Sequence, residues 1–144
     1  MDYQIYLAGG MQGLSFKEQN TWRLKLKQDI IQHCKDNNNR YSPNIINPCD
    51  FYNFESVAYR NDREVMEFDL HKVRTSQLVI VNFCSKPVSI GTAMELAVAR
   101  EHRIPIIGIT QEGINLHPWQ VECCTRLCES YDELINHIKD FYLV

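Results

Sequence analysis

The stretch SIGTAMELAVA, residues 89–99, decides the fold of this chain. It follows the apolar run LVIVNF at 78–83 and precedes a second apolar run, IPIIGI, at 104–109. Short apolar runs of this kind indicate buried strands, and the stretch between them is long enough for a helix. The order strand, loop, helix, strand is the repeating unit of a parallel α/β sheet, in which ligands bind where a strand ends and the next helix begins.

The rest of the chain repeats this alternation. We expect strands at 4–8, 44–47, 78–83, 104–109 and, more weakly, 126–128, and helices at 16–34, 62–75, 91–103 and 131–141. Residues 49–61 are aromatic and irregular, which is typical of a structured loop with a short helix. The sequence therefore predicts a single domain over residues 1–144, with a doubly wound, five-stranded parallel sheet flanked by helices, as in flavodoxin-like or Rossmann-like folds.

Composition excludes several classes of partner. The 144 residues carry a formal net charge of −3 and contain no basic tract, so we expect no nucleic acid polymer as partner. No apolar run approaches the ~20 residues of a membrane span, and the first residues enter a strand without a leader-like segment. Six scattered cysteines without C-x-x-C spacing indicate reduced thiols and no metal site, and together these features predict a cytoplasmic protein.

Glu95 is the first candidate for chemistry, because the predicted strand end and helix start place it near the ligand position of the sheet. Thr92-x-x-Glu95 also matches a capping box, in which Thr92 caps the helix and Glu95 bonds back to it. Alternatively, the carboxylate is a nucleophile or a base, with Gly91 allowing a substrate close to the backbone and Thr92 offering a hydroxyl.

Asp69 lies within an apolar arc of its predicted helix. At ~100° per residue, it falls one turn from both Val65 and Val73. An acid in such a place is costly unless it is paired or used. Either it forms an i, i+3 pair with Lys72, or it is a functional carboxylate with a shifted pKa.

A glycine cluster, Gly9-Gly10-Met-Gln-Gly13, follows the first predicted strand. It is either a permissive turn or a backbone cradle for a sugar or phosphate, with Gly9 and Gly10 closest to the strand end. Within the same strand, Tyr6 faces opposite to its neighbours. Its hydroxyl is either satisfied within the core or presented to a carboxylate at the sheet edge.

Two further polar side chains stand at predicted strand ends or helix starts. Asn47 precedes Pro48 at the end of the second strand, where an amide binds a ligand hydroxyl or base. Ser89 is either a turn or cap hydroxyl, or an anion contact at a helix N-terminus.

Taken together, these pieces resemble the nucleoside 2-deoxyribosyltransferase family, which includes transferases and related N-glycoside hydrolases of nucleoside 5′-monophosphates. The order and spacing of the matching blocks cover most of the chain, and the last block is the most specific. They are Ile5-Tyr-Leu-Ala-Gly-Gly, Ile46-Asn-Pro, Glu67-Phe-Asp69 and Gly91-Thr-Ala-Met-Glu-Leu-Ala.

The resemblance implies a double displacement at the anomeric carbon of a nucleoside or nucleotide, a small-molecule substrate of nucleotide salvage. Glu95 matches the nucleophile that forms a glycosyl ester, Asp69 the acid that protonates or orients the leaving base, and Tyr6 the group that positions the nucleophile. A second base or water then takes the sugar, so the outcome is base exchange or hydrolysis. Neither a cofactor nor a metal is implied.

Ser89 departs from the transferases, which tend to have an acid there; the monophosphate hydrolases resemble this chain in having serine. The resemblance therefore tilts the expected substrate toward a 5′-monophosphate. It also implies a homodimer or higher homo-oligomer, with the loop at 113–119, including Leu116 and Trp119, as the candidate contact. The alternatives are a non-catalytic nucleotide-binding or sensing module, in which Glu95 is only a cap, and a flavodoxin-like redox or receiver domain.

Overall fold

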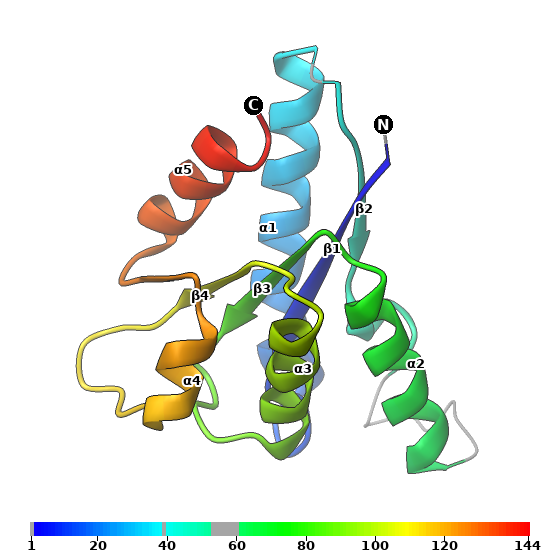
Figure 1. The fold of residues 1–144 in the computed structure, drawn as a ribbon, viewed down its shortest axis with the longest axis vertical. Coiled ribbons are helices and arrows are strands. Elements are labelled where there is room, and N and C mark those ends of the chain that lie inside the picture. The colour runs from blue at the N-terminus through cyan, green and yellow to red at the C-terminus, as the bar shows by residue number, and fades with distance from the viewer. Residues whose placement is uncertain (1, 39, 53–60) are drawn as a thin grey trace.

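Five parallel strands form one sheet in the order β2-β1-β3-β4-β5 (Figure 1). The structure is a computed structural model that describes residues 2–38, 40–52 and 61–144. The strands are β1 (Asp2–Gly9), β2 (Ser42–Ile46), β3 (Leu78–Asn82), β4 (Ile106–Ile109) and β5 (Arg126–Cys128). All four pairings are parallel, so every carboxyl end lies at the same edge of the sheet.

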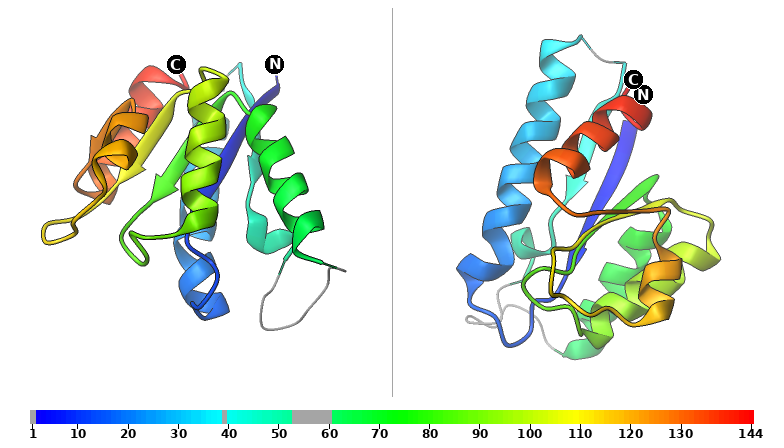
Figure 2. Two further views of the ribbon diagram at one scale, coloured as in Figure 1. Left: turned by 60° about the horizontal axis from the view of Figure 1, so that its bottom comes forward. Right: turned by 90° about the vertical axis from the view of Figure 1, so that its left-hand side faces the viewer.

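Helices cover both faces of the sheet, as the two views of Figure 2 show. The helices are α1 (Phe16–Asp36), α2 (Asp62–Arg74), α3 (Ile90–Glu101), α4 (Pro118–Cys123) and α5 (Tyr131–Phe141), with a 3-10 helix η1 (Pro48–Asp50) after β2. α1 packs with α5 on one face, and α3 packs between α2 and α4 on the other. The predicted fold class, a doubly wound five-stranded α/β sheet, is confirmed.

The alternation of side chains along β1 divides the core in two. Ile5 and Leu7 belong to the cluster under α1 and α5, whereas Tyr6 and Ala8 belong to the cluster under α2 and α3. All four side chains are fully buried. A buried tyrosine in the middle of an apolar strand therefore projects toward the α2–α3 layer.

The helices that follow β1 and β3 lie on opposite faces of the sheet. β1 is followed by α1 on one face, and β3 is followed by α3 on the other. The register pairs Gly9 with Asn82, so the two strands end level with each other. In a doubly wound sheet, a crevice opens at the carboxyl edge where neighbouring strands send their helices to opposite faces. In this sheet that position lies between β1 and β3.

The start of α3 differs from the capping-box interpretation. Ser89, not Thr92, is the N-cap, and its Oγ accepts a hydrogen bond of 3.3 Å from the Thr92 amide. Glu95 lies in the second turn of α3, where it has no capping contact to make. The predicted start at residue 91 is thus one residue late, and the interpretation of Glu95 as a helix cap is wrong.

Two other elements differ from expectation. The loop expected over 111–119 ends in α4, because Pro118 occupies a first-turn position and His117 forms a capping box with Gln120. In the segment 49–61, η1 confirms a short helical turn, while 53–60 lie outside the described residues. No helix among the described residues has the length and apolar character to cross a membrane.

The buried face of α1 is not apolar throughout. Its buried residues are spaced by three or four and are Gln19, Arg23, Leu26, Ile30 and Cys34. Leu24, an aliphatic residue of the same helix, is 40% exposed. The stripe that faces the sheet is therefore polar at its N-terminal end, beside the end of β1, and apolar further along.

Candidate active site

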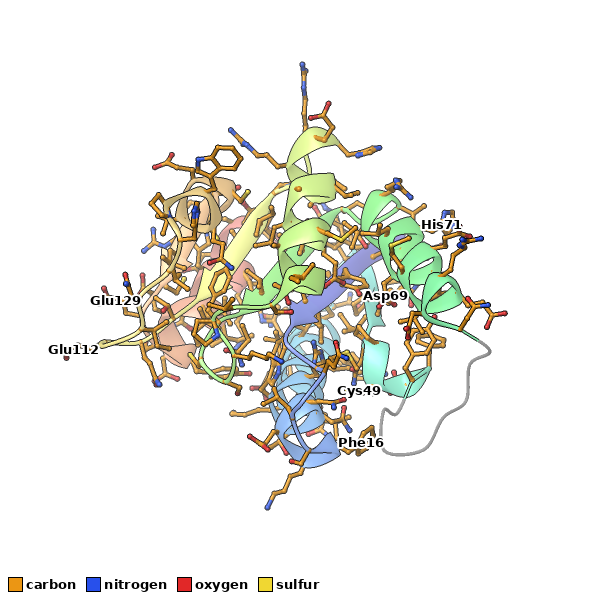
Figure 3. All side chains as sticks on the ribbon, turned by 90° about the horizontal axis from the view of Figure 1, so that it is seen from below. Phe16, Cys49, Asp69, His71, Glu112 and Glu129 are labelled. Atoms are coloured by element: carbon orange, nitrogen blue, oxygen red, sulfur yellow. The ribbon has the colours of Figure 1, made fainter. Side chains whose placement is uncertain are left out.

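A cavity of about 620 Å³ opens at the carboxyl edge of the sheet, between α2, α3 and the loops that follow β1 and β3. Figure 3 looks onto this end of the molecule, with Asp69 labelled on α2. The lining residues are Gly9, Met11, Gln12, Asp62, Val65, Met66, Asp69, Leu70, Lys86, Val88, Ser89, Ile90, Gly91, Thr92, Met94 and Glu95. The volume lies within the usual range for small-molecule sites.

Glu95 lines this cavity from the second turn of α3. Its neighbours on the same helix face, Thr92, Leu96 and Ala99, are buried with it, and Glu95 is only 8% exposed. Burial, with a smaller contribution from the nearby Asp69, raises the pKa of Glu95 to about 8, against the lowering effects of Tyr6 and Arg23. Within the part of the chain that the structure describes, this acid is removed from water without a compensating ion pair.

Asp69 reaches the same cavity from α2. Among the described residues it forms no ion pair, and the Nζ of Lys72 lies over the Phe68 ring, 5.5 Å from its centroid. The alternative i, i+3 pair with Lys72 is therefore not formed. Burial raises the pKa of Asp69 to about 7, and Arg23 and Tyr6 oppose this rise.

Tyr6 lies beneath the two carboxyls, on the β1 face that points toward α2 and α3. Its pKa is raised well above 10 by burial and by the charges of Glu95 and Asp69, so it remains a neutral hydroxyl. The hydroxyl is close enough to lower the pKa of both carboxyls, yet it completes no hydrogen bond of good geometry with either. The Tyr6 O–H group therefore lies near both acids and lacks a hydrogen-bond acceptor of good geometry among the described residues.

Unsatisfied polar atoms gather at this corner of the fold. Four fully buried side-chain oxygens have no hydrogen-bond partner among the described residues, and three of them belong here: Tyr6 Oη, Asp69 Oδ1 and Thr92 Oγ1. Each such atom costs roughly 1–3 kcal/mol when nothing pairs with it. Asp69 and Thr92 line the cavity, whereas Tyr6 is fully buried and does not, so only the first two residues border a ligand bound there.

The two carboxyls titrate as a coupled pair. Because the pKa of Asp69 is raised to about 7 and that of Glu95 to about 8, at least one of the two carboxyls is largely protonated at neutral pH. One ionised and one protonated carboxyl beside a neutral hydroxyl provide a nucleophile or base and a proton donor within the same cavity.

The remaining predicted ligands divide into those that reach the cavity and those that do not. Gly9, Ser89, Gly91 and Thr92 line it. Gly10 does not line the cavity, but it packs against Lys86, which does. A Cβ at Gly10 would lie 2.6 Å from the Cβ of Lys86, so this close contact requires glycine.

Asn47 does not line the cavity. It is fully buried, its Nδ2 donates to Asn20 Oδ1 at 2.9 Å, and its Oδ1 accepts from the Cys49 amide at 3.0 Å. Both ends of the amide are thus used to start η1 after β2. Its role as a substrate ligand stays a prediction that these contacts do not favour.

Sequence inspection missed three contributors to the site. Lys86 reaches across the glycine loop, where its Nζ donates to the Gln12 carbonyl. Met66 and Met94, from α2 and α3, add flexible apolar walls. The position of Lys86, three residues before Ser89 in the loop after a buried strand, was the available signal for the lysine.

The loop at 113–119 contributes no lining residue among those described. Leu116 is partly buried against the core cluster beneath α2 and α3, and its place in a subunit contact stays a prediction. Trp119 is 79% exposed, as the expected contact requires. Gln120 Nε2 donates to the Pro87 carbonyl at 3.1 Å and so joins α4 to the loop that borders the cavity.

Comparison with known families agrees with these observations. The model of the nucleoside 2-deoxyribosyltransferase family matches residues 5–136, which is most of the chain. The protein belongs to this family. Membership supports a glycosyl-transferring or N-glycoside-cleaving enzyme that acts on nucleosides, without distinguishing transfer from hydrolysis.

Several solved structures share the fold at low sequence identity. A conserved protein from Enterococcus faecalis V583 aligns with a TM-score of 0.77 and 17% identity over 97% of this chain and 99% of the other. A 2-deoxyribosyltransferase from Bacillus psychrosaccharolyticus gives 0.68 and 16% over 92% and 90%. The CMP N-glycosidase BcmB from Clostridium botulinum gives 0.60 and 19% over 97% and 99%. No curated protein matches the chain in sequence.

The buried Glu95 carboxyl predicts an unusual dependence of stability on pH. Its pKa is raised from 4.5 to about 8 on folding, so its contribution to stability is complete below pH 4.5 and is lost as pH rises through 8. Glu95→Gln removes this loss. We expect the variant to be more stable than the wild type at pH 8, by on the order of a few kcal/mol, and similar to it at pH 5.

Urea denaturation at the two pH values measures this difference. Glu101→Gln, on the exposed last turn of the same helix, is the matched control and should keep the wild-type pH dependence. A Glu95→Gln protein no more stable than the wild type at pH 8 would show that the carboxyl is not held in a dry environment.

Proposed function

We propose that the protein cleaves or transfers the N-glycosidic bond of a 2′-deoxynucleoside, a ribonucleoside or the corresponding 5′-monophosphate through a glycosyl ester on Glu95. The observation that carries the proposal is the cavity corner where two buried carboxyls, one on α2 and one on α3, lie beside the Tyr6 hydroxyl. Family membership supports the same reaction class. We also propose a cytoplasmic location, which the six free cysteines favour.

In the first step, an ionised oxygen of Glu95 attacks C1′ of the sugar. The C1′–N bond breaks, its electron pair passes to the nucleobase, and Asp69 supplies the proton that makes the base a neutral leaving group. In the second step, water or another base attacks C1′ and the ester bond to Glu95 breaks. The attacking group returns a proton to Asp69, and both carboxyls regain their starting state.

The proton must lie on Asp69 when Glu95 attacks. Burial raises the pKa of both carboxyls in the empty cavity, so substrate binding has to place the proton on Asp69 and the charge on Glu95. The Tyr6 hydroxyl lowers the pKa of both acids and supports whichever of them is ionised. A nucleobase nitrogen placed against Asp69 favours a protonated Asp69, because it accepts a hydrogen bond from that proton.

The mouth of the cavity suits an anionic substituent on the sugar. Ser89 caps α3, and the first-turn residues Ile90 and Gly91 line the cavity, so the N-terminus of this helix borders it. Lys86 is the single basic side chain among the described lining residues. These groups support a 5′-monophosphate as the preferred substrate, with hydrolysis to free base and sugar phosphate as the alternative to base exchange.

Loss of the Glu95 carboxyl should abolish turnover and leave the fold intact. We expect Glu95→Ala to lose at least 10³-fold in rate, an order of magnitude taken from nucleophile removal in other covalent enzymes, with an unchanged circular dichroism spectrum. Chromatography after incubation with nucleosides and 5′-monophosphates, with and without a second base, measures it. Free base alone indicates hydrolysis, and a new nucleoside indicates transfer.

Mass spectrometry of acid-quenched wild-type enzyme should find one glycosyl adduct on the peptide that contains Glu95. A fully active Glu95→Ala enzyme would refute the mechanism. A well-folded wild type that binds nucleotides without converting any of them would instead support the non-catalytic binding module.

Substitution at Ser89 should reverse the preference between nucleotide and nucleoside. Ser89→Asp keeps a helix cap but places a negative charge beside the expected phosphate. We expect kcat/KM for the 5′-monophosphate to fall by at least tenfold and that for the nucleoside to change little. Ser89→Asn, a neutral cap, is the matched control, and an equal loss for both substrates in Ser89→Asp would contradict phosphate binding here.

We also propose a homodimer or higher homo-oligomer. Three apolar side chains are strongly exposed: Val88 at 75% and Ile90 at 81%, which line the cavity, and Trp119 at 79% on α4. Exposed apolar side chains beside a site are typical of an interaction surface, and Trp is enriched in interfaces. The contact to Pro87 holds α4, and with it Trp119, beside this loop.

Sedimentation velocity of Trp119→Ser tests this surface. We expect the variant to sediment as a smaller species than the wild type, and its KM to rise because the neighbouring subunit borders the cavity. Phe141→Ser, an equally exposed aromatic on α5, should sediment as the wild type does. A monomeric wild type at micromolar concentration would contradict the proposal.

A further inference from the structure

Arg23 is the largest fully buried side chain of the described protein, and it lies at the end of β1. Its Nε donates to the Leu7 carbonyl at 3.2 Å and its Nη2 to the Gly9 carbonyl at 3.1 Å. Its Nη1 donates to the carbonyl of Gln19 and contacts Cys49 Sγ at 3.9 Å. The guanidinium is thus held rigidly between α1, η1 and the last residues of β1.

None of these partners is a charged group. No ion pair of Arg23 is formed among the described residues. A guanidinium remains charged in a protein even when burial lowers its pKa, as it does here. Burying an unpaired charge costs several kcal/mol, and carbonyl dipoles offset only part of this. An apolar side chain would satisfy packing alone, so the retained charge calls for an electrostatic explanation.

The negative counterpart is the acid pair across the sheet edge. Arg23 interacts electrostatically with Tyr6, Asp69 and Glu95, and it favours the ionised form of both acids. The guanidinium also passes Gly9 closely, since a Cβ there would lie 3.3 Å from Nη2. Gly9 borders the cavity, so the charge stands directly behind the cavity wall.

We propose that Arg23 is a positioning residue for the reaction at Glu95: its fixed charge behind β1 keeps the buried acid pair singly ionised, and its hydrogen bonds fix the strand end that borders the substrate. This role rests on the proposed function for its catalytic meaning, but its electrostatic part stands without it. With one proton on the pair, Arg23 and one carboxylate form a buried set of no net charge. Without Arg23, desolvation would favour two protonated acids and no nucleophile.

Other ionisable groups near the pair enter this balance. Tyr6 from β1 stays neutral, and so does Tyr52 after η1, whose pKa is raised to about 12 by burial and by the charge of Asp69. Cys49 from η1 contacts Arg23 and has its pKa raised by burial, and Asp62 and Lys86 line the cavity. Arg23 is the buried cation among them.

The test compares Arg23→Gln with Arg23→Lys. Loss of the charge should move the acidic limb of the kcat/KM profile to higher pH by about one unit, which is about a tenfold loss of activity on that limb. Carbon-13 titration of the Glu95 and Asp69 carboxyls in ligand-free protein should show the same displacement. Arg23→Lys keeps a cation and should keep the limb near its wild-type position.

Gln19→Met is the matched control, because Gln19 is a fully buried neutral side chain one turn away that bonds the Met11 and Leu14 carbonyls. A purely structural role for this end of α1 predicts lower stability in both Gln19→Met and Arg23→Gln, with the pH profile unmoved. An Arg23→Gln protein whose carboxyls titrate as in the wild type overturns the proposal.

Where Arg23→Gln alone does not fold, the double variant Arg23→Gln/Glu95→Gln decides. Because the two charges are expected to support each other, removing both should restore folding, whereas failure to restore it overturns the proposal. The carboxyl titration also separates the two hypotheses. A wild type without turnover refutes the proposed function, while the titration still shows whether Arg23 holds the charge of the acid pair.

Discussion

The structure depends on one constraint: two carboxyl groups must share a water-poor corner at the carboxyl edge of the sheet. Glu95 and Asp69 come from different helices, and burial raises the pKa of both. Desolvation opposes the ionisation of both acids, and the charge of Asp69 further opposes that of Glu95, while Arg23 acts in the opposite direction. The corner therefore favours a state in which at least one of the two acids is protonated, which suits acid-assisted nucleophilic chemistry.

The sheet supplies the geometry that this constraint requires. β1 and β3 are neighbours that end level, and the helices that follow them leave on opposite faces. The crevice between them is bounded by α3 on one side and α2 on the other, so each helix can offer one acid to it. Tyr6 is positioned by its strand and not by a loop, because the alternation of side chains along β1 directs it toward the α2–α3 layer.

Much of this arrangement could be predicted from local pattern. The apolar runs at 78–83 and 104–109 give buried strands, and α5 has the predicted bounds. β5 also has the predicted bounds, although its three residues gave only a weak strand signal. Asp69 was found by its place in an apolar arc. The same argument applied to α1 would have found Arg23, since Gln19, Arg23 and Leu26 share one helix stripe.

Other features are set by contacts that a linear pattern does not contain. Asn47 stands at a strand end like a ligand, yet tertiary contacts to Asn20 and the Cys49 amide use both of its polar ends. The Thr92–Glu95 spacing fits a capping box, but the helix begins earlier. Ser89, three residues before Thr92, is the N-cap and accepts a hydrogen bond from the Thr92 amide. Lys86 becomes part of the site only because its side chain crosses the glycine loop of a distant segment.

The unsatisfied oxygens of Tyr6, Asp69 and Thr92 connect stability with activity. A fold selected for stability alone would pair them or replace them with apolar groups, since each costs free energy while the cavity is empty. Satisfying them within the protein would rotate the acids away from the cavity or hydrogen-bond the donors that a substrate needs. Under the proposed function, a substrate that pairs with Asp69 and Thr92, which line the cavity, would offset part of this cost and convert it into binding and orientation at the acid pair.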